Sequence, residues 1–115
     1  MSDDCLFCRI VSGAIPADVV LDDDLVLAFR DVAPKAPVHV LLIPREHIAS
    51  AVELTDAHGA LLGRLFAVGA AVARQEGVAE SGYRIVTNAG ADAGQSVHHL
   101  HLHLLGGRSL AWPPG

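Results

Sequence analysis

The chain has 115 residues, of which 51% are hydrophobic and 18% charged, enough for one domain with a buried core and too few for two. This composition excludes a disordered or fibrous protein, and no apolar run reaches the roughly 18 residues of a membrane-spanning helix. The net charge of −5 disfavours a nucleic-acid partner, and an acidic rather than basic N-terminal segment leads us to expect a cytoplasmic protein.

The first expected elements are a short helix and three strands. Residues 5–11 are an apolar stretch after the polar residues 2–4, which is typical of a helix start. The apolar runs 19–21 and 25–29 flank an acidic triplet and predict a hairpin. A third strand is predicted over residues 38–43, between two prolines.

One long helix is predicted over residues 55–75, where apolar residues recur at helical spacing between a Thr55 cap and a Gly77 stop. Its many small residues allow the close approach of another backbone, which is either a partner subunit or the molecule's own sheet. Two further strands are predicted over residues 83–87 and 97–105. Short connections between the strands indicate an α+β fold with a largely antiparallel sheet.

Seven histidines are present, and four of them lie between positions 98 and 103. Residues 99–104 alternate histidine with leucine, which on a strand places His99, His101 and His103 on one face. The leucines on the opposite face are expected to enter the core, which fixes this orientation. Three histidines on one face indicate a functional site.

The spacing of these histidines suggests two kinds of chemistry. On an ideal strand His99 and His103 are roughly 13 Å apart, so we do not expect one metal ion to bind all three rings. The glycine-bearing loop of residues 88–96 leads into the strand, and its backbone amides, with Gln95 and Ser96, suit a phosphate. One imidazole can attack phosphorus while a neighbouring ring holds the phosphate oxygens.

Cys5 and Cys8 have the Cys-x-x-Cys spacing of half a structural zinc site. His47 and His99 are the candidate remaining ligands, which leaves His101 and His103 for phosphate. A redox pair is not favoured because no βαβ unit is expected. The other interpretation is a pair of ordinary buried thiols.

Several segments match a known pattern. Residues 99–105 read HLHLHLL, the histidine triad pattern His-φ-His-φ-His-φ-φ. The other matching segments are CLFCRIV (5–11), AFRD (28–31), HVLLIPREHI (39–48) and GQSV (94–97). Through these segments nearly the whole chain resembles the HIT superfamily of nucleotide hydrolases and transferases. The C-terminal segments GGR (106–108) and WPPG (112–115) are similar to the Hint branch, the histidine triad nucleotide-binding proteins.

The resemblance implies a HIT-like fold, with an antiparallel sheet of about five strands, one long helix and a short N-terminal helix in a single domain spanning residues 1–115. It implies a homodimer in which the sheets and long helices of two subunits join. The implied reaction is hydrolysis of the P–N bond of purine nucleoside phosphoramidates, such as AMP linked to an amine or lysine. A structural zinc ion and no organic cofactor are expected, with no nucleic-acid or membrane partner.

The catalytic roles implied by position belong to the triad. His101 is the implied nucleophile, which forms a covalent nucleotidyl-histidine that water resolves. His103 and Ser96 are implied to contact the phosphate and assist the leaving amine. His99 is implied to orient the nucleophilic ring or the strand.

The resemblance also implies a nucleotide-binding set. Asp31 is implied to hold the ribose hydroxyls, and Trp112 to reach into the partner subunit's site. The residues implied at the ribose and phosphate are Asn88, Gly94 and Gln95. The residues implied in the apolar base pocket are Phe7, Ile10, Phe29, Val32 and Leu42.

Two positions depart from the family pattern. Arg30 replaces the usual histidine before Asp31, and His98 stands where Hint proteins often carry an aromatic residue. Two alternative functions remain: a dinucleoside polyphosphate hydrolase of the Fhit type, and a non-catalytic, nucleotide-binding or zinc-binding dimeric adaptor. His103 speaks against the transferase branch, which commonly has glutamine there, and the C-terminal tail favours the Hint branch over Fhit.

Overall fold

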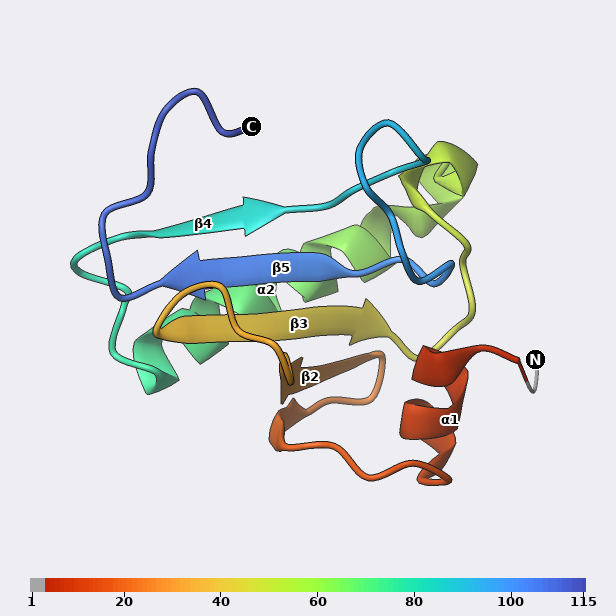
Figure 1. The fold of residues 1–115 in the computed structure, drawn as a ribbon. Coiled ribbons are helices and arrows are strands. Elements are labelled where there is room, and N and C mark those ends of the chain that lie inside the picture. The colour runs from red at the N-terminus through yellow and green to blue at the C-terminus, as the bar shows by residue number, and fades with distance from the viewer. Residues whose placement is uncertain (1–3) are drawn as a thin grey trace.

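The computed structural model describes residues 4–115, whose main features are one sheet and two α-helices (Figure 1). In chain order the elements are α1 (Leu6–Ser12), β1 (Val19–Asp22), β2 (Val26–Arg30), β3 (Val38–Pro44), the 3-10 turns η1 (Ala51–Glu53) and η2 (Asp56–His58), α2 (Gly59–Gln75), β4 (Tyr83–Val86) and β5 (Leu102–Gly106). The α+β class, the five strands, the long helix and the short N-terminal helix are therefore confirmed. No helix among residues 4–115 has the length and hydropathy needed to cross a membrane.

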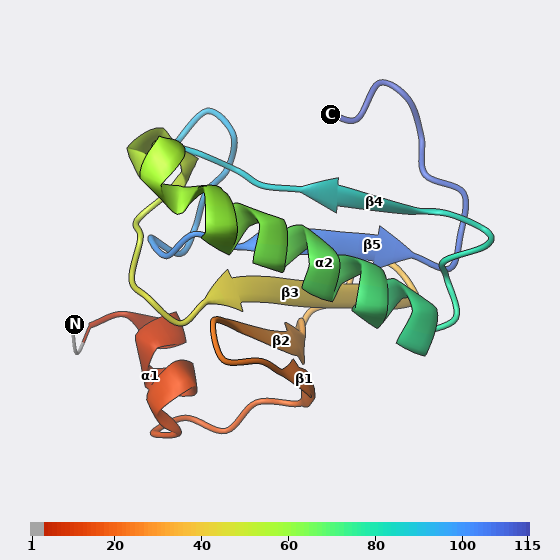
Figure 2. The ribbon, with the colours of Figure 1, turned by 180° about the vertical axis from the view of Figure 1, so that it is seen from behind.

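The five strands form one antiparallel sheet in the order β1-β2-β3-β5-β4. Helix α2 crosses one face of this sheet (Figure 2). Alternate residues of β2 enter separate cores: Val26 and Ala28 belong to the core that contains α2, while Leu27 and Phe29 pack with Phe7 of α1. Because both faces of the sheet are covered, the sequences of β2 and β3 are almost entirely apolar. Only the alternation of side chains along each strand tells which residue lies on which face.

Helix α2 packs closely on its own sheet. A Cβ atom at Gly69 would lie 3.2 Å from Cδ1 of Leu42 and 3.3 Å from Cδ1 of Ile85, so glycine permits this approach. A Cβ at Gly59 or Gly63 would meet nothing within 4 Å among the described residues. Packing onto the molecule's own sheet therefore accounts for Gly69 but not for the other two glycines.

Strand β5 is shorter than the sequence predicts, since it begins at Leu102 and not at residue 97. Its pairing with β3 ends at Leu42–Leu102, and its pairing with β4 ends at Val86–His103. Before this point the Leu100 N–H donates to the Ile48 carbonyl at 2.6 Å, outside the sheet. His99 and His101 therefore lie on a bent segment that precedes the strand.

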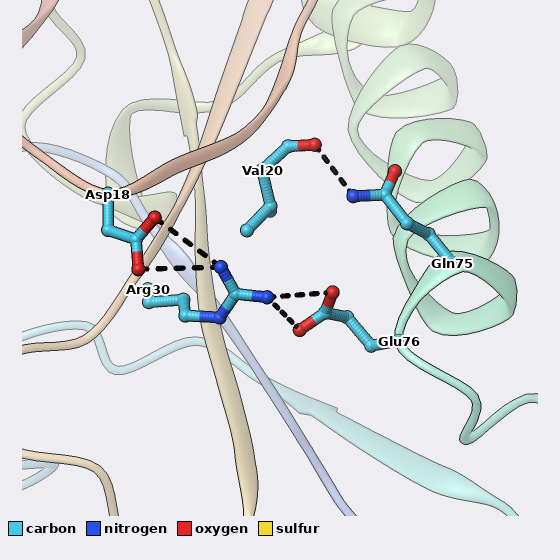
Figure 3. A network of polar contacts seen from close by, with 5 residues as sticks. All are labelled: Asp18, Val20, Arg30, Gln75 and Glu76. Carbon is cyan, nitrogen blue, oxygen red and sulfur yellow. Dashed lines mark hydrogen bonds and ion pairs between the residues drawn. The ribbon is translucent and has the colours of Figure 1, made fainter.

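A polar network ties the C-terminal end of α2 to the β1–β2 edge of the sheet (Figure 3). The guanidinium of Arg30 donates to both carboxylate oxygens of Glu76, at 2.7 and 2.9 Å, and to Asp18 at 3.4 Å. Beside it, the Gln75 side-chain amide donates to the Val20 carbonyl at 2.9 Å. Arg30, which departs from the family pattern, thus has a structural role at this edge.

Candidate active site

A pocket of about 680 Å³ lies on the face of the sheet opposite α2, against α1. Its apolar part includes Phe7 and Phe29, whose rings meet edge to face at 5.5 Å. The full lining is Leu6, Phe7, Ile10, Ile15, Pro16, Ala17, Asp18, Phe29, Arg30, Asp31, Val32, Leu41, Ser96, Val97, His101 and His103. An apolar cavity with a few polar groups gathered on its wall is the usual form of a small-molecule site.

His101 is a buried histidine on the pocket wall, only 6% exposed. Its Nδ1 lies 2.7 Å from the His99 carbonyl oxygen. Because a carbonyl can only accept, Nδ1 carries the proton of the neutral ring. The Nε2 atom then keeps its lone pair, which is the form required of an imidazole nucleophile.

His103 is set in the opposite tautomer by a chain of hydrogen bonds that begins at the backbone. The Lys35 N–H donates to Nδ1 of His39 at 3.0 Å, so the neutral His39 ring carries its proton on Nε2. That Nε2–H donates to Nδ1 of His103 at 2.9 Å. The remaining proton of His103 therefore lies on Nε2, which makes this ring a hydrogen-bond donor.

Burial favours the neutral form of His103 and of His39. Burial, followed by the neighbouring His101 and His39 rings, which disfavour a further positive charge, lowers the pKa of His103 to about 4. Burial also lowers the pKa of His39, although Asp31, 3.4 Å from its Nε2, acts in the other direction. Sequence reasoning missed His39, which shares its face of β3 with the pocket residue Leu41, two positions along the strand.

Cys5, Cys8, His47 and His99 form a second site, here called the metal cluster. Their ligand atoms all lie within 4.8 Å of one another. The Cys5 and His47 ligand atoms are each 3.3 Å from Nδ1 of His99, and Sγ of Cys8 is 3.6 Å from it. A tetrahedral zinc ion with standard bond lengths places such ligand atoms about 3.3 to 3.6 Å apart. The donor set and its dimensions therefore fit zinc.

Hydrogen bonds around the metal cluster orient its candidate ligand atoms. Cys5 is the N-cap of α1, and its Sγ accepts the Cys8 N–H at 3.2 Å. The Nε2–H of His99 donates to the Pro44 carbonyl at 2.8 Å, which leaves Nδ1 unprotonated toward the thiols. Burial lowers the pKa of His99, so the ring is neutral, as a metal ligand must be. The sequence predicted a cap from residues 2–4, and residues 2 and 3 lie outside the described part of the chain.

The structure brings eight of the fourteen expected catalytic and nucleotide-binding residues to the pocket. Asp31, Ser96, His101 and His103 line it together, and His99 instead belongs to the metal cluster. The base-pocket residues found there are Phe7, Ile10, Phe29 and Val32.

Leu42 is placed elsewhere, which corrects the expectation for the base pocket. It is fully buried in the core that contains α2, and Leu41 lines the pocket in its place. Successive strand residues point to opposite faces, so an assignment that is off by one residue selects the wrong face.

The loop residues expected at the phosphate lie outside the lining of the pocket. Asn88, Gly94 and Gln95 are not among the described residues that line the pocket. The side-chain amide of Gln95 donates to the Ala49 carbonyl at 2.8 Å and the Val97 carbonyl at 3.0 Å, and its Oε1 accepts the Gly90 N–H. Gln95 therefore holds together the loop that presents Ser96.

Trp112 lies in the C-terminal segment, away from this pocket. Its side chain is 80% exposed, and its ring lies 5.9 Å from the guanidinium carbon of Arg84 on β4. A single chain therefore leaves the indole open to solvent.

Comparison with known proteins identifies the family. The family model of the HIT domain matches residues 12–110, which include the pocket's histidines. The chain belongs to the HIT family. Among HIT relatives, the purine nucleoside phosphoramidase of Escherichia coli K12 is 46% identical over 110 residues, covering 96% of this chain and 92% of that protein.

Solved HIT structures share the fold. A HIT family hydrolase from Legionella pneumophila superimposes with a TM-score of 0.95 at 49% identity, covering 97% of this chain and all of that one. A histidine triad nucleotide-binding protein from Candida albicans has a TM-score of 0.81 at 30% identity, covering 96% of this chain and 83% of that one. The HIT-like fold expected from the sequence is thereby confirmed.

Proposed function

We propose that the chain is a nucleotide-binding hydrolase that cleaves the P–N bond of purine nucleoside phosphoramidates, in which AMP is linked to an amine or lysine. The observation that carries this proposal is the hydrogen bond from Nδ1 of His101 to the His99 carbonyl, because it leaves Nε2 as a nucleophile in the pocket wall. The Escherichia coli relative named purine nucleoside phosphoramidase supports the choice of substrate.

The reaction proceeds in two displacements at phosphorus. Nε2 of His101 attacks the phosphorus atom, a P–N bond forms to the ring, and the bond to the leaving amine breaks. The Nε2–H of His103 and the Ser96 hydroxyl contact the phosphate and supply the proton that leaves with the amine, and the water that attacks next returns this proton. Water then attacks the nucleotidyl-histidine, which releases the nucleoside monophosphate and restores His101.

The nucleotide occupies the 680 Å³ pocket from its apolar part to its histidines. The purine lies against Phe7, Phe29 and Leu41, and the Asp31 carboxylate holds the ribose hydroxyls. Asn88, Gly94 and Gln95 belong to the loop at the proposed ribose and phosphate position, and Gln95 holds the part of this loop that presents Ser96. Trp112 completes the site from the partner subunit.

Zinc is the metal that the Cys5/Cys8/His47/His99 donor set favours, since two thiolates and two imidazoles make a common structural zinc site. Bound there, it supplies structural stabilisation and leaves the phosphate chemistry to His101 and His103. Neither cysteine is part of a disulfide, and we propose a cytoplasmic location, where thiols stay reduced.

A homodimer is the proposed assembly. On α2, Phe66 is 53% exposed, and a Cβ at Gly59 or Gly63 would meet nothing within 4 Å among the described residues. Strand β4 lies at the edge of the sheet. A second copy joined along α2 and β4 would cover these groups, in agreement with the arrangement that the HIT resemblance implies.

The decisive experiment compares the wild-type protein with His101→Ala on an adenosine phosphoramidate. We expect the wild type to release AMP and the amine, and the variant to lose turnover while still binding AMP, because Ala removes only the nucleophile. His98→Ala, which changes an exposed neighbouring histidine, is the matched control and should retain turnover.

Two outcomes would contradict the proposal. Undiminished turnover by His101→Ala would exclude this nucleophile, and a higher kcat/KM for a diadenosine polyphosphate than for the phosphoramidate would favour the Fhit-type alternative. AMP binding without turnover of either substrate by the wild type would favour a non-catalytic adaptor.

A further inference from the structure

We propose that the metal cluster positions the nucleotide site, so that metal binding and nucleotide binding strengthen each other. Cys5, Cys8 and His47 are then positioning residues for the proposed reaction, although none of them takes part in its chemistry. The inference rests on the proposed function and on zinc occupancy of the cluster, and its tests separate these three claims.

The first connection runs through His99. Its ring belongs to the metal cluster, while its backbone carbonyl accepts the Nδ1–H of His101 at 2.7 Å. His99 is fully buried, and its Nε2–H donates to the Pro44 carbonyl. The ring and the backbone carbonyl of His99 therefore cannot shift independently of each other. A metal ion that holds Nδ1 of His99 therefore also fixes the carbonyl that orients the proposed nucleophile.

The second connection runs through α1. Cys5 caps this helix and Cys8 lies one turn later, while Phe7 between them lines the pocket. The Phe7 ring packs edge to face on His99 at 5.9 Å and on His101 at 5.1 Å. Ligation of the two cysteines therefore fixes the helix that supplies one wall of the nucleotide pocket.

This wall depends on tertiary contacts. Helix α1 has seven residues, too few to be stable by itself. The cluster joins it to His47, which follows β3, and to His99, which precedes β5. Without a metal ion these three segments are joined at the cluster by thiol–imidazole and imidazole contacts of 3.3 to 3.6 Å. A metal–ligand bond is stronger than such contacts, so metal binding reduces the disorder that the nucleotide must otherwise remove.

Coupling of this kind is reciprocal. If zinc raises the affinity for AMP by some factor, AMP must raise the affinity for zinc by the same factor. A zinc ion that has no energetic effect on the pocket would leave the AMP affinity of the folded protein unchanged, so this factor would be one. A factor greater than one, found in both directions, is therefore the specific signature of the proposal.

The experiment measures both halves of this cycle. AMP affinity is measured by calorimetry on zinc-loaded and chelator-stripped protein, and zinc affinity by competition with a chromogenic chelator, with and without saturating AMP. We expect about a tenfold increase in each direction, within the usual range for coupled sites. Circular dichroism verifies that the stripped protein stays folded, because unfolding on zinc loss would by itself couple the two ligands through the fold. If stripping unfolds the wild type, the comparison is made on the folded fraction of His47→Ala at low zinc.

His47→Ala provides the matched variant because His47 is an exposed ligand that does not line the 680 Å³ pocket. Its AMP affinity should fall about tenfold at zinc concentrations that load only the wild type, and recover when excess zinc loads the variant. His47→Cys, which offers a thiolate ligand, should restore the coupling at low zinc. His98→Ala should bind both ligands as the wild type does.

The results distinguish the three claims. A coupling factor of one, with both ligands bound, overturns this proposal and leaves the proposed function standing. Failure to bind zinc overturns it together with the metal assignment, and failure to bind AMP overturns it together with the proposed function.

Discussion

Three of the buried histidines have one ring nitrogen paired with a backbone group of another residue. Nε2 of His99 donates to Pro44, Nδ1 of His101 donates to His99, and Nδ1 of His39 accepts from Lys35. Because each backbone group can only accept or only donate, it fixes the tautomer of its partner ring before any ligand binds. In the proposed function the remaining ring nitrogens serve metal ligation by His99, nucleophilic attack by His101 and hydrogen-bond donation by His39.

The pKa of His103 predicts an acid-sensitive fold. In an unfolded chain a histidine titrates near pH 6.5, whereas burial lowers the pKa of His103 to about 4. The unfolded chain therefore binds more protons between these values, and the free energy of unfolding should decrease as the pH falls from 6.5 toward 4. One extra proton gives a slope of at most about 1.4 kcal/mol per pH unit.

Urea unfolding of the wild type and of His103→Asn over this pH range measures the effect. The variant should show a shallower loss of stability on acidification, because it lacks the titrating ring. His98→Gln, which removes an exposed histidine, should keep the wild-type slope. Identical slopes for the wild type and His103→Asn would refute the prediction.

The two neighbouring leucines of β3 should separate binding from stability. Leu42→Ala removes a fully buried side chain from the core that contains α2 and should lower the free energy of unfolding by about 2–5 kcal/mol, with AMP affinity unchanged. Leu41→Ala should weaken AMP binding, because Leu41 lines the pocket. Chemical denaturation and calorimetry on both variants check this assignment; weaker AMP binding by a folded Leu42→Ala would reverse it.

At the scale of elements, hydrophobic patterning predicted every strand and both α-helices, with boundaries displaced by a few residues. The exception is the strand predicted over 97–105, which begins at Leu102 because its pairing with β3 and β4 ends there. Same-face Cα atoms on a strand are about 7 Å apart, and the His101 and His103 rings lean together to a centroid distance of 4.9 Å. Single-sequence patterning could not supply this bend, since it depends on where the partner strands end.

The candidate site was predictable to the extent that side-chain chemistry alone defines it. The Cys-x-x-Cys spacing and the triad indicated which residues to consider, and resemblance to HIT proteins added Asp31 and the expected roles. His39 could not be predicted as a site residue, because a single histidine in an apolar strand has no distinctive sequence pattern. Its importance follows only from the Lys35 N–H and the His103 ring on either side of it.

Helix α2 offers a test of its close packing on the sheet. Gly69→Ala would bring a methyl group within 3.2 Å of Leu42, and such overpacking typically costs about 1–3 kcal/mol. This cost should exceed the gain of roughly 1 kcal/mol from replacing glycine within a helix. We therefore expect a lower free energy of unfolding by urea titration. Ala67→Gly, at an exposed position of the same helix, is the control that measures helix propensity alone.

At the scale of the whole molecule, the proposed dimer should depend on the outer face of α2. Phe66→Glu places a charge at a position that is half exposed in one chain and would be buried in the proposed dimer. Sedimentation velocity should show a dimer for the wild type and a monomer for this variant at micromolar concentration. A wild-type monomer, or a dimer unaffected by Phe66→Glu, would contradict the placement of the interface.

Loss of the dimer should also lower turnover at the pocket if Trp112 completes the partner subunit's site. Phosphoramidate turnover by Phe66→Glu should then fall to the level of Trp112→Ala, although Phe66 lies on α2 and not at the pocket. The double variant should show no additional loss, because both changes remove the same indole from the site. Additive losses would indicate separate effects.

The metal cluster also has a consequence for the topology of the chain. Cys5 and His99, which meet there, are 94 positions apart in the sequence. An ion bound to both would close most of the polypeptide into a ring, much as a disulfide does in an oxidising compartment. By loop-closure entropy such a ring stabilises the folded state by as much as about 4–5 kcal/mol, with no contribution from the core. A protein held in this way would gain the benefit of a long-range cross-link where disulfides do not form, and a chelator would open the ring without cutting a covalent bond.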